Sequence, residues 1–115
     1  MGGIIMNFFT PAEVAKNYIA TGKSKVNTPI PKMIILAILA GAFIGFGGVG
    51  ATTVAVSITE PSLGKFIGAC VFPGGLTMVL IAGSELFTGN CLLTIPLLEK
   101  EITVSQMLKN WVIVY

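Results

Sequence analysis

The stretch GSELFTGN (residues 83–90) decides the fold, because it is a polar interruption inside a long apolar sequence. Apolar residues precede it from Phe66, and the apolar run resumes after it for only about two helical turns, from Cys91 to Leu98. The whole span 66–98 is too long for one straight membrane crossing and too short for two crossings joined by an aqueous loop. The pattern therefore predicts a broken membrane helix.

The composition agrees with a membrane location. Hydrophobic residues make up 54% of the chain and charged residues only 10%, against roughly 25% charged in an ordinary globular domain. The 115 residues have room for about three crossings of about 20 residues each. We expect an all-α membrane protein. The net charge is +2. The chain has no basic stripe on a polar fold, which argues against nucleic-acid binding.

The first crossing is predicted at Met33–Ile58, which contains no charged residue and is long enough to span a hydrocarbon core. Small residues recur along it at spacings of four and three. They are typical of a face that packs closely against another helix. These residues are Ala37, Gly41, Gly45, Gly48 and Thr52.

The second apolar segment begins at Phe66, and the sequence predicts a kink near Phe72, because Pro73 removes a backbone donor and the two following glycines soften the helix. A third helix is expected from Thr103, and the chain is expected to stop within it, at Tyr115. The organisation predicted is an N-terminal segment at 1–31 and the first half of a transmembrane channel domain at 32–115.

The N-terminal segment contains a predicted amphipathic helix over 10–25. Thr10 and Glu13 have the spacing of a capping box, and Tyr18 and Ile19 share an apolar face. Two interpretations remain open. The helix lies on the cytoplasmic membrane surface, or it is an ordinary surface helix without lipid contact. A cluster of lysines precedes the first crossing, which predicts a cytoplasmic N-terminus in a multi-pass inner (plasma) membrane protein. These are Lys16, Lys23, Lys25 and Lys32.

The chain offers little to a metal or a cofactor. It contains no histidine, and its two cysteines, Cys70 and Cys91, fall in apolar stretches where a thiol behaves as a small hydrophobe. We expect no cofactor, no metal site and no disulfide. An enzyme is disfavoured as well, because no base, nucleophile pair or metal cluster is present.

The break itself is the predicted functional site. Irregular backbone at membrane depth is tolerated only where protein buries it or water lines it. A half-helix that starts there offers free N–H groups and a partial positive charge that attract anions. Thr88, Gly89, Asn90 and Cys91 would surround that helix start. Thr88 either lines a pore or bonds backward to a helix carbonyl.

Five further side chains leave two interpretations each. Glu85 is the one carboxylate deep in the apolar stretch, and it acts either as a proton relay or as a structural acceptor of hydrogen bonds from loop amides. The apolar residues nearest the kink and the break form either ordinary packing or a hydrophobic constriction. They are Phe72, Leu76, Leu86 and Phe87.

Three motifs in register resemble the formate/nitrite transporter family, and the similarity covers nearly all residues from Thr10 onward. They are FPGGL (72–76), GSELFTGN (83–90) and KNW (109–111) with Tyr115. Within the family, the chain is most similar to the hydrosulfide-channel branch. The resemblance implies the first half of an aquaporin-like fold built from two inverted halves, and a homopentamer with one pore per protomer.

The resemblance also implies residue roles. Thr88 corresponds to the threonine at the pore centre, Leu86 and Phe87 to its flanking constriction, and Phe72 and Leu76 to apolar rings in the same conduit. Asn90 belongs to the same pore motif, while Glu85 and Gly89 shape the loop. The implied function is a channel for small monovalent anions such as formate, nitrite or hydrosulfide, which pass as neutral acids.

Two rival functions remain open. The same architecture suits an aquaporin-type neutral-solute channel, although no Asn-Pro-Ala triplet occurs. The small-residue face of the first crossing suits a noncatalytic membrane anchor that holds partner subunits.

Overall fold

The structure of the chain is a computed structural model, and it describes residues 8–115. Over this range the protein is all-α, as predicted, with no strand. It forms a flat body of 53 × 42 × 21 Å. The part of the predicted N-terminal segment at residues 1–7 lies outside the described residues.

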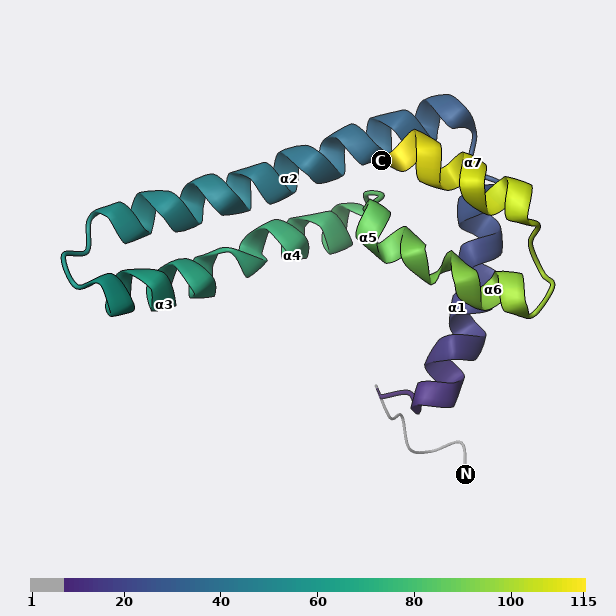
Figure 1. Ribbon diagram of the computed structural model, residues 1–115, viewed down its shortest axis with the longest axis horizontal. Helices are drawn as coiled ribbons and strands as arrows, with labels where there is room; N and C mark the ends of the chain where they lie inside the picture. The colour runs from purple at the N-terminus through teal and green to yellow at the C-terminus, as the bar shows by residue number, and fades with distance from the viewer. Residues whose placement is uncertain (1–7) are drawn as a thin grey trace.

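The longest element is α2 (Ile30–Val56), which runs antiparallel to the pair α3 (Pro61–Val71) and α4 (Pro73–Ala82) in a long hairpin (Figure 1). Helix α2 begins three residues before the predicted Met33, because proline is tolerated in the first turn of a helix and Pro31 lies there. It ends at Val56, two residues before the predicted Ile58. At about 1.5 Å per residue its 27 residues reach about 40 Å, enough for a tilted crossing.

The hairpin has the surface of a membrane protein. Helix α2 and the combined span Pro61–Ala82 are both long and apolar enough to cross a bilayer, and only 17% of the most apolar window of each is buried. A core helix of a soluble protein would be mostly covered. Large apolar side chains are instead exposed along both arms, including Ile38, Phe46, Phe66, Leu80 and Ile81.

The predicted kink near Phe72 is confirmed. Helix α3 ends at Val71, and α4 starts with Pro73 at its first position. Proline has no amide N–H, so the backbone hydrogen-bond ladder of α3 cannot continue through Pro73. The second crossing is therefore two short helices with a bend between them (Figure 1).

The hairpin closes through a different row of small residues from the one predicted. A Cβ added at Gly75 would lie 2.8 Å from the Phe43 carbonyl oxygen, and one at Gly47 would lie 2.9 Å from that of Phe72. By contrast, Gly41, Gly45 and Gly48 have no atom of residues 8–115 outside their own helix within 4 Å of such a Cβ. The predicted packing face is therefore not the one that forms this hairpin, because both faces of α2 carry small residues and the glycines of α3 and α4 select between them. Its contact with another helix stays a prediction.

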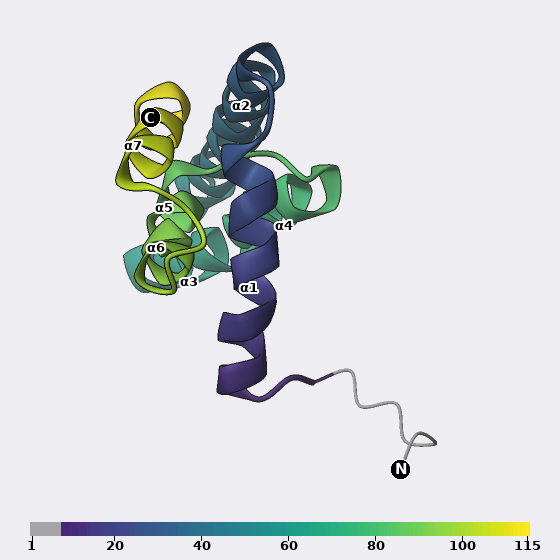
Figure 2. The same cartoon turned by 90° about the vertical axis from the view of Figure 1, so that its right-hand side faces the viewer.

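Helix α1 (Pro11–Val26) confirms the predicted N-terminal helix and its capping box, in which Thr10 and Glu13 bond to each other's backbone N–H. Tyr18 and Ile19 are half-buried, whereas Val14 is 53% exposed. The helix lies across one end of the hairpin, roughly perpendicular to α2 (Figures 1 and 2). If α2 crosses a membrane, α1 lies along its surface.

After the break the chain continues as α5 (Phe87–Asn90), a 3₁₀ turn η1 (Cys91–Leu93) and α6 (Thr94–Leu98). These pack against α1, where Gly22 approaches the side chains of Pro96 and Leu93 closely. Helix α7 (Val104–Val114), which confirms the predicted third helix, then runs beside the start of α2 (Figure 1). A small buried core joins these parts: Val26, Leu93, Ile102 and Met107.

Candidate functional site

The predicted break is present, and it occupies Gly83–Leu86 between α4 and α5. Gly83 ends α4 with φ +67°, a left-handed conformation that suits glycine. The Ser84 N–H then bonds back to the Val79 carbonyl at 3.0 Å, which closes a Schellman-type cap. Leu86 is extended, and α-helix resumes at Phe87, so Thr88, Gly89 and Asn90 belong to the new helix and not to the loop.

One backbone group of the loop bonds to a neighbouring helix. The Glu85 N–H donates to the Leu36 carbonyl of α2 at 3.3 Å. The N–H groups of Phe87, Thr88 and Gly89 start the new helix, and the first α-helical bond of this turn runs from the Asn90 N–H to the Leu86 carbonyl at 3.0 Å. The helix start therefore presents free donors, which favour negative charge.

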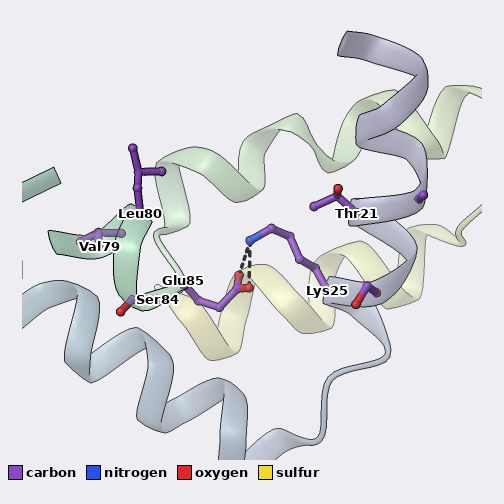
Figure 3. Close-up of a pocket in the computed structure, with 9 residues that line it drawn as sticks. Thr21, Lys25, Val79, Leu80, Ser84 and Glu85 are labelled. Atoms are coloured by element: carbon purple, nitrogen blue, oxygen red, sulfur yellow. Dashed lines mark hydrogen bonds and ion pairs between the residues drawn. The ribbon is translucent and has the colours of Figure 1, made fainter. Parts of the chain in front are cut away.

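The buried Glu85 carboxylate forms an ion pair with the partly exposed Lys25 of α1. The Lys25 Nζ lies 2.8 Å from both carboxylate oxygens, and the Glu85 side chain is only 9% exposed (Figure 3). The Lys25 ammonium compensates the negative charge that Glu85 places among apolar residues. The pair borders a cleft of about 600 Å³ between α1 and the end of α4, where Thr21 and Ser24 lie beside Lys25.

Asn90 extends this pair into a network. Its Nδ2 group donates to Glu85 Oε2 at 2.8 Å and to Asn110 Oδ1 at 2.9 Å, so it links the break to α7. Trp111 Nε1 donates to the Asn90 carbonyl at 2.8 Å. Asn90 and Asn110 are 0% and 1% exposed, which makes this a polar core inside an apolar protein.

Three of the predicted pore residues meet at one cavity. Leu76, Leu86 and Thr88 line a space of about 240 Å³ together with Lys25 and Tyr18 of α1. Thr88 is exposed there, in the first turn of the new helix. The remaining lining is mostly apolar: Val79, Leu80, Ser84, Gly89 and Leu92. The arrangement is an apolar cavity with one hydroxyl-bearing helix start and one cation.

The other three predicted pore residues lie elsewhere. Phe87 turns toward α7, where its ring meets those of Trp111 and Tyr115 edge-on at 6.0 and 5.2 Å between centroids. Phe72 is 46% exposed at the kink. Asn90 is fully buried in the polar network. The pore role of all six residues stays a prediction.

The partners of Glu85 differ from those expected for a structural role. The carboxylate accepts from the side chains of Lys25 and Asn90, whereas the sequence predicted loop amides as donors. Two loop amides have other acceptors, because that of Ser84 donates to the Val79 carbonyl and that of Glu85 donates to the Leu36 carbonyl. Within residues 8–115, Ser84 Oγ and Asn90 Oδ1 are buried without a hydrogen-bond partner.

Metal-binding clusters of three or more His, Cys, Asp or Glu residues are absent from residues 8–115. Cys70 and Cys91 are both free and exposed. The chemistry of the site therefore rests on hydroxyl, amide, ammonium and carboxylate groups.

Sequence reasoning missed two residues of the site, Lys25 and Tyr18. It used Lys25 only as part of a lysine cluster and Tyr18 only as an apolar surface. A signal was present, since Tyr18, Gly22 and Lys25 are spaced by four and three and so share one face of α1. Asn110 and Trp111 had been noticed as a motif, but without the contacts to Asn90 that the structure gives them.

Comparison with known proteins gives a consistent result. A family model described as formate/nitrite transporter matches residues 12–115. A probable formate transporter of Methanothermobacter thermautotrophicus is 40% identical over 111 residues, which cover 92% of this chain and 40% of that protein.

Two relatives with channel names are also similar. The formate channel BtFdhC of Bacillus thuringiensis is 41% identical over 93% of this chain and 42% of its own length. The formate channel FocA of Escherichia coli K12 is 34% identical over 91% of this chain and 38% of its own. The chain thus spans about two-fifths of the length of these relatives. No solved structure matches it significantly.

Proposed function

The chain belongs to the formate/nitrite transporter family, and from this premise we propose that it forms the first half of a membrane channel for small monovalent anions. Formate, nitrite and hydrosulfide are the candidate substrates. The relatives' names support formate most directly, because those of M. thermautotrophicus, B. thuringiensis and E. coli all carry it. The protein conducts solutes and is not an enzyme.

One observation carries the proposal: the start of a broken membrane helix opens with Thr88 onto a cavity that Lys25 also lines. The free N–H groups of the helix start favour an anion, whereas the charge of Lys25 is already balanced by Glu85. Leu76, Leu86 and Leu92 make the rest of the wall apolar, where a bare anion is strongly penalised and a small neutral acid is not. The helix start therefore attracts the anion, and passage occurs as the neutral acid while Thr88 orients it.

The resemblance to the family and the exposed surfaces support a proposal for the surrounding assembly. We propose a homopentamer of an aquaporin-like fold in the inner (plasma) membrane, with α1 on the cytoplasmic side. In support, the small-residue face of α2 is uncovered by residues 8–115 and is free for other helices. Lys16, Lys23, Lys25 and Lys32 lie at the α1 end of the hairpin, as the positive-inside rule requires of a cytoplasmic end.

The test is anion flux into liposomes that contain the complete protein. Formate, nitrite and hydrosulfide should enter faster than into empty liposomes, and formate entry should rise as the pH is lowered. Thr88→Val keeps the shape and removes the hydroxyl. Loss of one hydrogen bond to the passing neutral acid should lower formate flux roughly two- to tenfold.

Thr94→Val is the matched control, because Thr94 lies two turns further along the same half-helix and its hydroxyl bonds to the Cys91 carbonyl. Its flux should equal that of the unmodified protein. Liposomes no more permeable than empty ones, or equal flux for the two threonine variants, would rule the proposal out.

A further inference from the structure

Two side chains from distant helices hold the first turn of α5. The Tyr18 hydroxyl of α1 donates to the Gly89 carbonyl at 3.1 Å, and Trp111 Nε1 of α7 donates to the Asn90 carbonyl at 2.8 Å. Tyr18 lies 71 residues from Gly89 in sequence, and Trp111 lies 21 residues from Asn90. The two carbonyls are consecutive and follow Thr88 directly. The turn that carries Thr88 is therefore held by one hydrogen bond from α1 and one from α7.

This turn needs external support. Helix α5 has only four residues and lacks a side-chain cap at Leu86. It passes at once into the 3₁₀ turn at Cys91–Leu93, whose hydrogen-bond geometry is poorer than that of an α-helix. Each carbonyl has two lone pairs, so Gly89 and Asn90 can accept a side-chain donor beside any helical bond. The two donors supply the restraint that the short helix lacks.

Tyr18 also faces the cavity that Thr88 lines. Burial raises the pKa of its phenol, and the negative charge of Glu85 raises it further, so the hydroxyl stays protonated and remains a donor throughout the physiological range. Trp111 is fixed in turn by its edge-on contact with Phe87. Both donors are thus held in place by contacts of their own.

We infer that Tyr18 and Trp111 are positioning residues that fix the Thr88 hydroxyl at the wall of the conduit by clamping the carbonyls of Gly89 and Asn90. The inference rests on the proposed function for the meaning of Thr88. The clamp consists of the two hydrogen bonds to these carbonyls, and it can be tested without any measurement of transport.

The structural test is amide hydrogen exchange of the complete protein, read on a peptide that covers 86–93. Tyr18→Phe keeps the ring and removes the donor, and Trp111→Phe removes the indole donor and leaves a smaller aromatic ring. Each should speed exchange in this peptide roughly fivefold, the effect of one net hydrogen bond on a local opening. Tyr115→Phe is the control, because the Tyr115 ring also packs on Phe87 but its hydroxyl bonds to no residue in 8–115. Unchanged exchange in Tyr18→Phe and Trp111→Phe would overturn the clamp.

The functional test is a double-mutant cycle on formate flux. Tyr18→Phe alone should lower flux roughly fivefold, and it should have little further effect in a Thr88→Val background, because it acts through Thr88. General destabilisation would lower flux equally in both backgrounds, and that result would overturn the positioning role. If the unmodified protein conducts no anion, the proposed function fails, while the exchange experiment still decides the clamp.

Discussion

The hairpin of α2 with α3 and α4 is joined by backbone contact at glycines, whereas the junction of α1, α5 and α7 is joined by buried polar side chains. In the hairpin the helices satisfy their own backbone apart from the bond that is missing at Pro73, so close packing of smooth surfaces is enough. At the junction a helix has been opened, and its charges and carbonyls require partners from other helices. Close packing of small residues thus holds the hairpin, whereas hydrogen bonds and an ion pair hold the junction.

The sharpest way to break the comparison is to remove the cation of the junction. Lys25→Met leaves the Glu85 carboxylate buried with Asn90 as its remaining side-chain partner, and a broken buried pair costs about 3–5 kcal/mol of the free energy of unfolding. We expect a large fall in thermal stability of the purified complete protein in detergent.

Two variants serve as controls for that experiment. Lys23→Met removes the exposed pair with Glu101, whose side chains are 51% and 44% exposed, and should cost less than about 1 kcal/mol. Lys25→Met combined with Glu85→Gln removes both charges and should recover part of the loss. Equal stability of Lys23→Met and Lys25→Met would show that the buried pair does not hold the junction.

The hairpin should respond to shape alone. Gly75→Ala places a Cβ 2.8 Å from the Phe43 carbonyl oxygen and 3.3 Å from the Gly47 Cα, and both are backbone atoms that cannot move aside. Overpacking of this kind costs about 1–3 kcal/mol of the free energy of unfolding. The same stability assay with Gly74→Ala, where no atom of residues 8–115 beyond its own helix lies within 4 Å, should show no comparable loss. A similar fall in both variants would contradict backbone contact as the cause.

The smallest effect is expected at the exposed start of α1, far from the polar junction at its other end. The backbone N–H and the hydroxyl of Thr10 both bond to Glu13 and hold the pKa of its carboxyl below the ordinary 4.5. A lowered folded-state pKa stabilises the helix start above the ordinary value, and the stabilisation is lost as the pH falls through the lowered one.

NMR titration of the Thr10 amide would measure this effect, with a midpoint below 4.5 expected. Glu13→Gln should abolish the transition. A midpoint at or above the ordinary value would show that the capping box does not form in solution.

Much of the fold was predictable because the bilayer imposes a strong rule on sequence. The crossings, the kink at Pro73 and the break before Phe87 each followed from apolar length, a missing donor or a polar interruption. Element ends were less accurate, as α2 shows. This helix begins at Ile30 and not at the predicted Met33, because proline is tolerated in the first turn of a helix.

The amino-acid sequence by itself determined that this protein is helical, membrane-spanning and interrupted at residues 83–86, because each property depends on local hydrogen bonding and apolar length. Only the tertiary structure decided which partners close the interruption. Lys25 and Tyr18 reach Glu85 and Gly89 across 60 and 71 residues, and the packing face of α2 was selected by glycines on another helix. Such pairings depend on how helices are placed against one another, and the pattern along a single helix does not encode that placement.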